Sequence, residues 1–151
     1  MRVSPVGFLA SSLEECPELA AQSALPSHDS PQAIAGAKAA AAAIYLARTG
    51  SSKEEIRDYL EAEFVYNLHR SYDEVREEVR HARATRETDY EASHERIVGA
   101  EPAVQDALIA FLSGSDYEDI IRKAIYLGGD ADTEAAIAGG LAAAYYGVPE
   151  E

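Results

Sequence analysis

The stretch PQAIAGAKAAAAAIYLARTG, residues 31–50, decides the fold because it predicts one long helix with a surface of small side chains. Alanine has the highest helix propensity, and its short side chain allows neighbouring helices to approach closely. Pro31 suits the first position of a helix, where its missing N–H costs nothing, and Gly50 suits the residue that ends one. We therefore expect a central, buried helix from Pro31 to about Arg48.

Helical patterns continue on both sides of this segment. Ser12 and Glu15 resemble a capping box that opens a helix to about Ala24, and Ser52 and Glu55 repeat the same spacing. Three further segments carry apolar residues at helical spacing: Ile56, Leu60 and Phe64; Val104, Leu108, Phe111 and Leu112; and Tyr117, Ile120, Ile121 and Ile125. No stretch alternates apolar and polar residues as a strand does. The sequence therefore predicts an all-α fold, a compact helical domain of six or seven helices that spans residues 1–151.

Composition narrows the class of protein. Hydrophobic residues make up 47% of the 151 residues, and 27 Asp and Glu against 13 Lys and Arg give a net charge of -14. Such a surface repels phosphate backbones and anionic lipids, so we expect neither nucleic acid nor a membrane as a partner. The single cysteine, Cys16, cannot form an internal disulfide, which favours a cytoplasmic location.

The segment 71–101 differs from the rest of the chain. It is dense in glutamate and arginine, and its apolar residues are sparse: Val75, Val79, Tyr90 and Ile97. Such a charge run is typical of a solvated helical face or of a mobile excursion. We assign no role to the histidines in or beside it.

The sequence GGDADT, residues 128–133, carries the strongest chemical signal. Asp130, Asp132 and Thr133 offer oxygen atoms, which hard cations such as Mg²⁺ prefer, directly after two glycines that permit a sharp turn. The alternative interpretation is structural, because Asp and Thr are common at helix starts, where they cap free N–H groups. Spacing alone leaves both interpretations open.

Four segments resemble one known family. The stretch AIYLGGDADTEAAIAGGLAAAYYG, residues 124–147, is very similar to the closing signature of the ADP-ribosylglycohydrolases, which include the dinitrogenase reductase-activating glycohydrolases and crystallin J1. MRVSPVGF (1–8), LPSHDSPQAIAGAKAAAAAIYLARTGSSKEEI (25–56) and AVQDALIAFLSGSDYEDIIRKAIYL (103–127) resemble earlier family segments, in family order. Residues 71–101 fit the family least well. The resemblance implies an all-α fold like the C-terminal part of the family's domain.

The resemblance also implies a chemistry. In the family, two magnesium ions, or manganese in some members, support hydrolysis of the glycosidic bond to ADP-ribose. Carried over, the metal ligands are Asp130, Asp132 and Thr133. His28 matches a histidine near the substrate, and the backbone of Gly128 and Gly129 would also contact ADP-ribose, so ADP-ribose or an ADP-ribosylated substrate is the implied partner.

The resemblance covers only the C-terminal half of the family pattern. A Thr-Asp-Asp motif that supplies the remaining metal ligands, an acidic residue near the scissile bond and a Gly-Asn-Gly turn are all missing from this sequence. Ser27 stands where a threonine is usual, and Asp29 and Ser30 are atypical. We therefore expect half of a metal site, weak or absent metal binding and little turnover by the chain alone, and we assign no catalytic residue.

Three interpretations of the incomplete pattern remain open: half of a split enzyme, a non-catalytic helical module that binds a partner chain or ADP-ribose, and a metal-free structural remnant. Helices that lack their family neighbours would expose apolar surface, which favours association with other chains. We therefore expect self-association through 31–48 and 132–146, or marginal stability of the isolated chain.

Overall fold

The computed structural model describes residues 1–150, and all regular structure in them is helical. The helices are α1 (Ser4–Leu9), α2 (Cys16–Ala24), α3 (Pro31–Arg48), α4 (Lys53–Glu63), α5 (Tyr72–Ala84), α6 (Tyr90–Val98), α7 (Ala100–Ser113), α8 (Tyr117–Leu127) and α9 (Ala131–Tyr146). The predicted all-α fold is confirmed. The predicted number of six or seven helices is wrong, since the part of the chain described contains nine.

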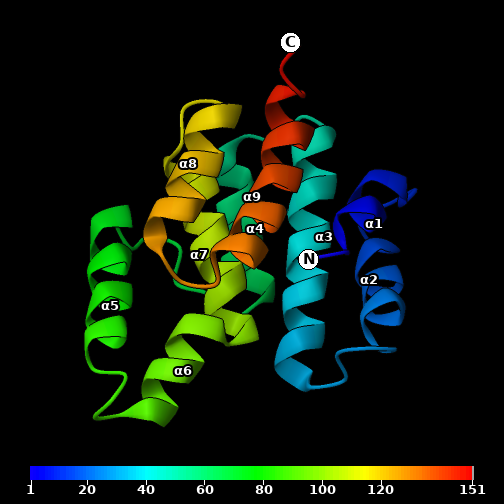
Figure 1. The fold of residues 1–151 in the computed structure, drawn as a ribbon. Coiled ribbons are helices and arrows are strands. Elements are labelled where there is room, and N and C mark those ends of the chain that lie inside the picture. The colour runs from blue at the N-terminus through cyan, green and yellow to red at the C-terminus, as the bar shows by residue number, and fades with distance from the viewer. Residues whose placement is uncertain (151) are drawn as a thin grey trace.

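Helix α3 lies at the centre of the molecule, as its alanine content predicts. It packs against α1, α2, α4, α7 and α9, and Figure 1 shows it between the α1–α2 pair and the α7–α9 group. Residues 39–44 of α3 are all buried. A Cβ added to Gly7 of α1 would lie only 2.6 Å from the carbonyl oxygen of Ala41, so small residues bring the two helices into direct contact. No helix in residues 1–150 has the length and apolarity that crossing a bilayer requires.

Local sequence signals coincide with the observed helix ends at α3 and α4. Gly50 takes the left-handed conformation with φ of 94° after α3. At α4 both bonds of the capping box are present: the Ser52 hydroxyl accepts from the N–H of Glu55, and the Glu55 carboxylate accepts from the N–H of Ser52. Before α2, by contrast, the Glu15 carboxylate accepts from the N–H of Ser11, and the helix begins only at Cys16.

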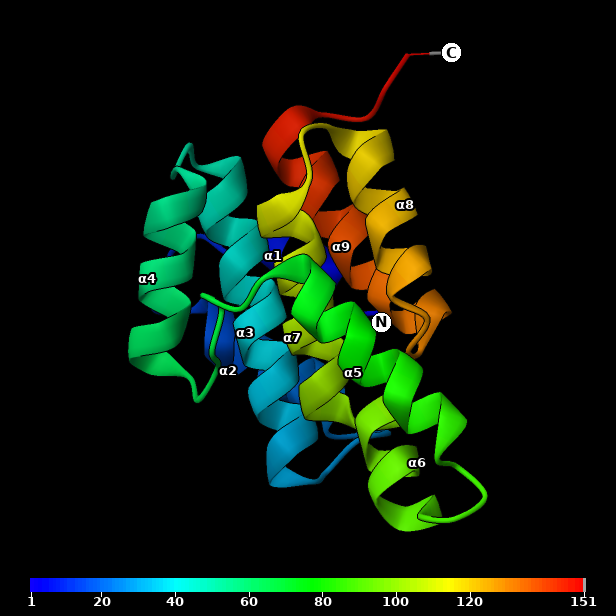
Figure 2. The same cartoon turned by 90° about the vertical axis from the view of Figure 1, so that its left-hand side faces the viewer.

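The charged segment 71–101 forms helices α5 and α6, which lie along α7 in Figure 2. Their sparse apolar residues Val75, Val79 and Ile97 are buried. Of the two interpretations of the charge run, the solvated helical face is therefore the correct one. The segment also lies beside the α8–α9 loop, which carries Asp130 and leads into the first turn of α9 with Asp132 and Thr133, because α5 packs against α8.

Candidate functional site

The loop between α8 and α9, orange in Figure 1, turns on two glycines. Gly128 ends α8 in the left-handed conformation with φ of 79°, which few other residues adopt at low cost. Gly129 is buried, and a Cβ at this position would collide with the carboxylate of Glu134. Asp130 follows directly, and α9 begins at Ala131. The loop therefore requires glycine at both positions for steric reasons, and it brings backbone and carboxylates together within one turn.

The two predicted carboxylate ligands interact with each other. Burial and the neighbouring Asp132 raise the pKa of Asp130, while the pKa of Asp132 is lowered through its interaction with Asp130 and through the N–H of Thr133. The backbone N–H of Thr133 donates to Oδ1 of Asp132 at 3.0 Å. Asp130 occupies the position before α9 but makes no side-chain capping bond. The capping interpretation therefore does not account for Asp130.

This donor set suits a hard cation in part. Within residues 1–150, neither Asp130 nor Asp132 forms an ion pair with a basic side chain. Two adjacent carboxylates without a basic side chain as ion-pair partner, together with the Thr133 hydroxyl, are oxygen ligands of the kind Mg²⁺ takes. No cluster of three or more His, Cys, Asp or Glu side chains arranged for a metal occurs in the described part of the chain. The loop thus offers one group of oxygen ligands and leaves most of a coordination sphere open.

Glu134, which follows the predicted ligands, is fully buried. Neither carboxylate oxygen has a hydrogen-bond partner in residues 1–150. Burial, followed by repulsion from Asp106, raises the pKa of Glu134 to about 8. Sequence reasoning missed this residue, although it shares a helical phase with the buried Ile137 and Leu141, so an acidic side chain at a core position was visible in the pattern.

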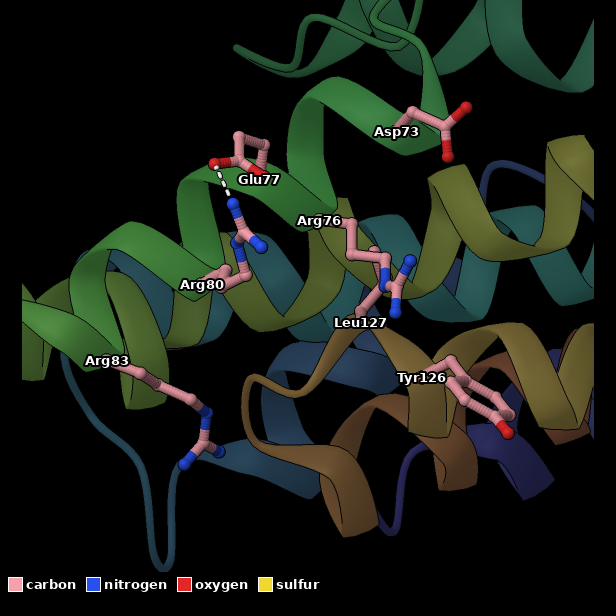
Figure 3. A pocket seen from close by; sticks show the side chains of 7 residues that line it. All are labelled: Asp73, Arg76, Glu77, Arg80, Arg83, Tyr126 and Leu127. Atoms are coloured by element: carbon pink, nitrogen blue, oxygen red, sulfur yellow. Dashed lines mark hydrogen bonds and ion pairs between the residues drawn. The ribbon is translucent and has the colours of Figure 1, made fainter.

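Arg83 of α5 forms two hydrogen bonds with the α8–α9 loop. Its Nε donates to the carbonyl oxygen of Gly128, and Nη2 donates to that of Gly129 at 3.0 Å. Figure 3 shows the side chain extending from α5 toward the loop that follows α8. A guanidinium that donates to two consecutive carbonyls fixes their orientation, and so the direction in which Asp130 leaves the loop. No local sequence signal identifies Arg83, because Gly128 and Gly129 follow it by 45 and 46 positions in the sequence.

Replacing Arg83 with alanine should loosen this loop without unfolding the domain. Loss of two charge-assisted hydrogen bonds, ~1–3 kcal/mol, should speed amide hydrogen exchange at residues 128–130 roughly tenfold or more. Arg80→Ala is the matched control, since Arg80 lies on the same helix but pairs only with the exposed Glu77. Equal exchange at the loop in both variants would show that Arg83 does not hold it.

His28, the predicted substrate residue, lies in the exposed loop before α3. Its Nδ1 forms a hydrogen bond with the Ser27 hydroxyl at 2.8 Å, and it makes none with residues 128–133. Arg2 also donates to Ser27, and the amino group of Met1 is close enough to Asp130 for their charges to interact. The His28 loop and the carboxylate loop therefore flank the same short segment at the N-terminus.

Comparisons with known proteins agree with the sequence resemblance. A family model described as ADP-ribosylglycohydrolase matches residues 1–151. An uncharacterized protein of Archaeoglobus fulgidus is 33% identical over 156 residues, which cover 99% of this chain and 50% of that protein. The chain therefore spans about half the length of this curated relative.

Proposed function

The chain belongs to the ADP-ribosylglycohydrolase family, and we propose that it contributes to hydrolysis of the glycosidic bond to ADP-ribose through a metal site on Asp130, Asp132 and Thr133. The observation that carries this proposal is the pair of interacting carboxylates at the glycine turn and in the first turn of α9, neither of which forms an ion pair with a basic side chain of residues 1–150. These residues belong to the segment that most resembles the family signature.

Each residue of the loop has a distinct part in this proposal. Asp130 and Asp132 would supply anionic oxygens to the metal, and Thr133 a neutral one. Bound there, a divalent cation would orient the ribose and lower the pKa of a water nucleophile. The backbone of Gly128 and Gly129 would contact ADP-ribose, with Arg83 holding the two carbonyl groups. His28 would contact the substrate from the neighbouring loop.

We further propose that the chain by itself turns over little substrate. Three oxygen ligands from one short segment leave a magnesium ion mostly hydrated, and residues 1–150 add no further acidic cluster arranged for a metal. A partner chain, or a second copy of this chain, would have to provide additional ligands and the group that moves the proton. Asp130, Asp132 and Thr133 would then form one side of a shared site.

Metal binding tests this proposal directly. Electron paramagnetic resonance of added Mn²⁺ should show weak binding to the chain, and Asp132→Asn should weaken it roughly tenfold or more, because an anionic ligand is lost. Asp58→Asn, at an exposed position of α4, is the matched control and should change nothing. Equal Mn²⁺ binding by all three proteins would contradict the assignment of the site. Metal-dependent release of ADP-ribose by the chain alone would contradict the proposed low turnover.

A further inference from the structure

Three arginines near the carboxylate loop lack acidic partners, although the chain carries a net charge of -14. Within residues 1–150, Arg80 pairs with Glu77 and Arg96 with Asp106. Arg76, Arg83 and Arg86 form no ion pair, and all three come from α5 or the turn that follows it. Unpaired guanidinium groups gathered in one region of an acidic protein indicate a place for an external anion.

Two of these arginines line a small pocket at the loop, which we call the arginine pocket. Its walls are Arg83, Arg86, His94, Ile97, Val98, Gly129 and Asp130, and its volume is about 220 Å³. Whole small-molecule ligands fill clefts of roughly 300–1,000 Å³, so this pocket suits one group of a larger ligand. Because Asp130 forms part of its wall, that group would lie directly beside the proposed metal site.

The ring of Tyr90 positions two polar side chains of the pocket, Arg86 and His94. It stacks on His94 with a centroid distance of 5.2 Å and an interplanar angle of 16°, and the Arg86 guanidinium lies 6.0 Å from the ring centroid. Arg86 and His94 therefore both lie against one aromatic ring, with N–H donors available to a ligand. Arg83 is already committed to the Gly128 and Gly129 carbonyls, so it positions the wall of the pocket.

The chemistry of the pocket favours a phosphoryl group. A guanidinium binds phosphate oxygens with two parallel N–H bonds, and an imidazole N–H adds a third donor. The first turn of α9, which starts at Ala131, presents further backbone N–H groups nearby. A cation on Asp130 would cancel the repulsion that this carboxylate exerts on an anion in the pocket.

We propose that the arginine pocket binds a phosphoryl group of a nucleotide ligand through Arg86 and His94, beside the carboxylate loop. This proposal rests on the proposed function in one respect, that the expected source of the phosphoryl group is the diphosphate of ADP-ribose. Free phosphate is the other source with the same chemistry. The pocket thereby gives the segment 71–101, the part least like the family, a role in ligand binding.

Calorimetric titration of the chain with ADP-ribose, ADP, inorganic phosphate and ribose, each with and without Mg²⁺, tests the proposal. We expect ADP-ribose and ADP to bind, and ribose not to bind. Arg86→Ala should weaken ADP binding roughly tenfold, as expected for loss of a charge-assisted hydrogen bond. Arg86→Lys should recover part of the loss, and His94→Ala should weaken binding less. Inorganic phosphate bound as tightly as ADP-ribose would identify free phosphate as the natural occupant of the same pocket.

Arg76→Ala is the matched control. Arg76 is also unpaired, but it lies on α5 and lines the neighbouring pocket with Tyr126, Arg80 and Arg83, as Figure 3 shows. Its replacement changes the net charge by the same amount as Arg86→Ala. It should alter ADP binding less than about twofold, since only screened long-range charge is lost. The proposal is wrong if the wild-type chain binds none of the phosphates, or if Arg86→Ala has no larger effect than Arg76→Ala. Asp132→Asn distinguishes the two proposals. If Asp132→Asn leaves Mn²⁺ binding unchanged, the proposed metal site is wrong. ADP binding measured without Mg²⁺ still tests the arginine pocket.

Discussion

At about pH 9, Glu134→Gln is expected to raise the free energy of unfolding by several kcal/mol, a large effect against a total of ~5–15 kcal/mol. The cause is the buried carboxylate, whose two oxygens have no partner in residues 1–150. Ionised, it would be a charge in a fully buried position beside Asp106, offset only in part by Arg96 and by the backbone of Asp130. Glutamine keeps the shape of the side chain and removes the charge, so the variant avoids this cost.

The sign of the pH dependence follows from the two pKa values. Burial raises the pKa of Glu134 to about 8 from the ordinary 4.5, so the folded protein keeps this proton where the unfolded chain has lost it. Between those two values the free energy of unfolding should fall by up to ~1.4 kcal/mol per pH unit as the pH rises, and then level off. Glu134→Gln should remove this part of the slope, so that the two proteins differ most above pH 8.

Denaturant titrations at a series of pH values measure this difference. Glu63→Gln is the control, since Glu63 is exposed at the end of α4 and its replacement should leave the pH profile unchanged. A wild-type stability that stays constant or increases between pH 5 and pH 8, with an identical profile for Glu134→Gln, would mean that Glu134 has an internal cation or donor as partner.

Local sequence signals were sufficient for the helices whose ends carry them. The helix from Pro31 to Arg48 has the predicted ends, because Pro31, the alanines and Gly50 each act through neighbouring residues. Helix α1 has only six residues and no side-chain cap, and Pro5 in its first turn is too weak a local signal to predict a helix by itself. Its short segment is held by packing of Gly7 against α3, a contact that only the folded chain creates. The helix count was therefore too low.

The residues of the candidate site also fall into two groups, those with a local sequence signal and those without one. Gly128, Asp130 and Asp132 could be proposed as site residues because they are contiguous in sequence. Arg83 and Arg86 reach the loop from α5 and the turn after it, and a charge run shows neither which arginines are paired nor which face they share. Sequence reasoning interpreted that segment as a solvated helical face or a mobile excursion, and predicted no pocket in it. Tertiary contacts are needed to distinguish a paired surface arginine from one held against a pocket.

Phe111→Ala is expected to lower the free energy of unfolding by roughly 3–5 kcal/mol, the range for truncating a buried phenylalanine. Phe111 is fully buried on α7 and meets the ring of Tyr145 from α9 edge-on, at 5.6 Å between centroids. The Nζ of Lys53 lies 4.9 Å from the Phe111 ring centroid and donates to the Phe111 and Gly114 carbonyls at 2.6 and 2.5 Å. One ring therefore supports contacts among α4, α7 and α9.

Chemical denaturation of Phe111→Ala should be compared with Phe111→Leu and Phe8→Ala. Leucine keeps most of the apolar volume, so its cost should stay near ~1–2 kcal/mol. Phe8 is 42% exposed on α1, and its removal should cost less than about 1 kcal/mol because little buried surface is lost. If Phe111→Ala and Phe8→Ala unfolded at the same denaturant concentration, Phe111 would contribute no more to stability than a partly exposed ring. Ligands that occupy the carboxylate loop or the arginine pocket should raise the denaturation midpoint of the wild-type chain by mass action.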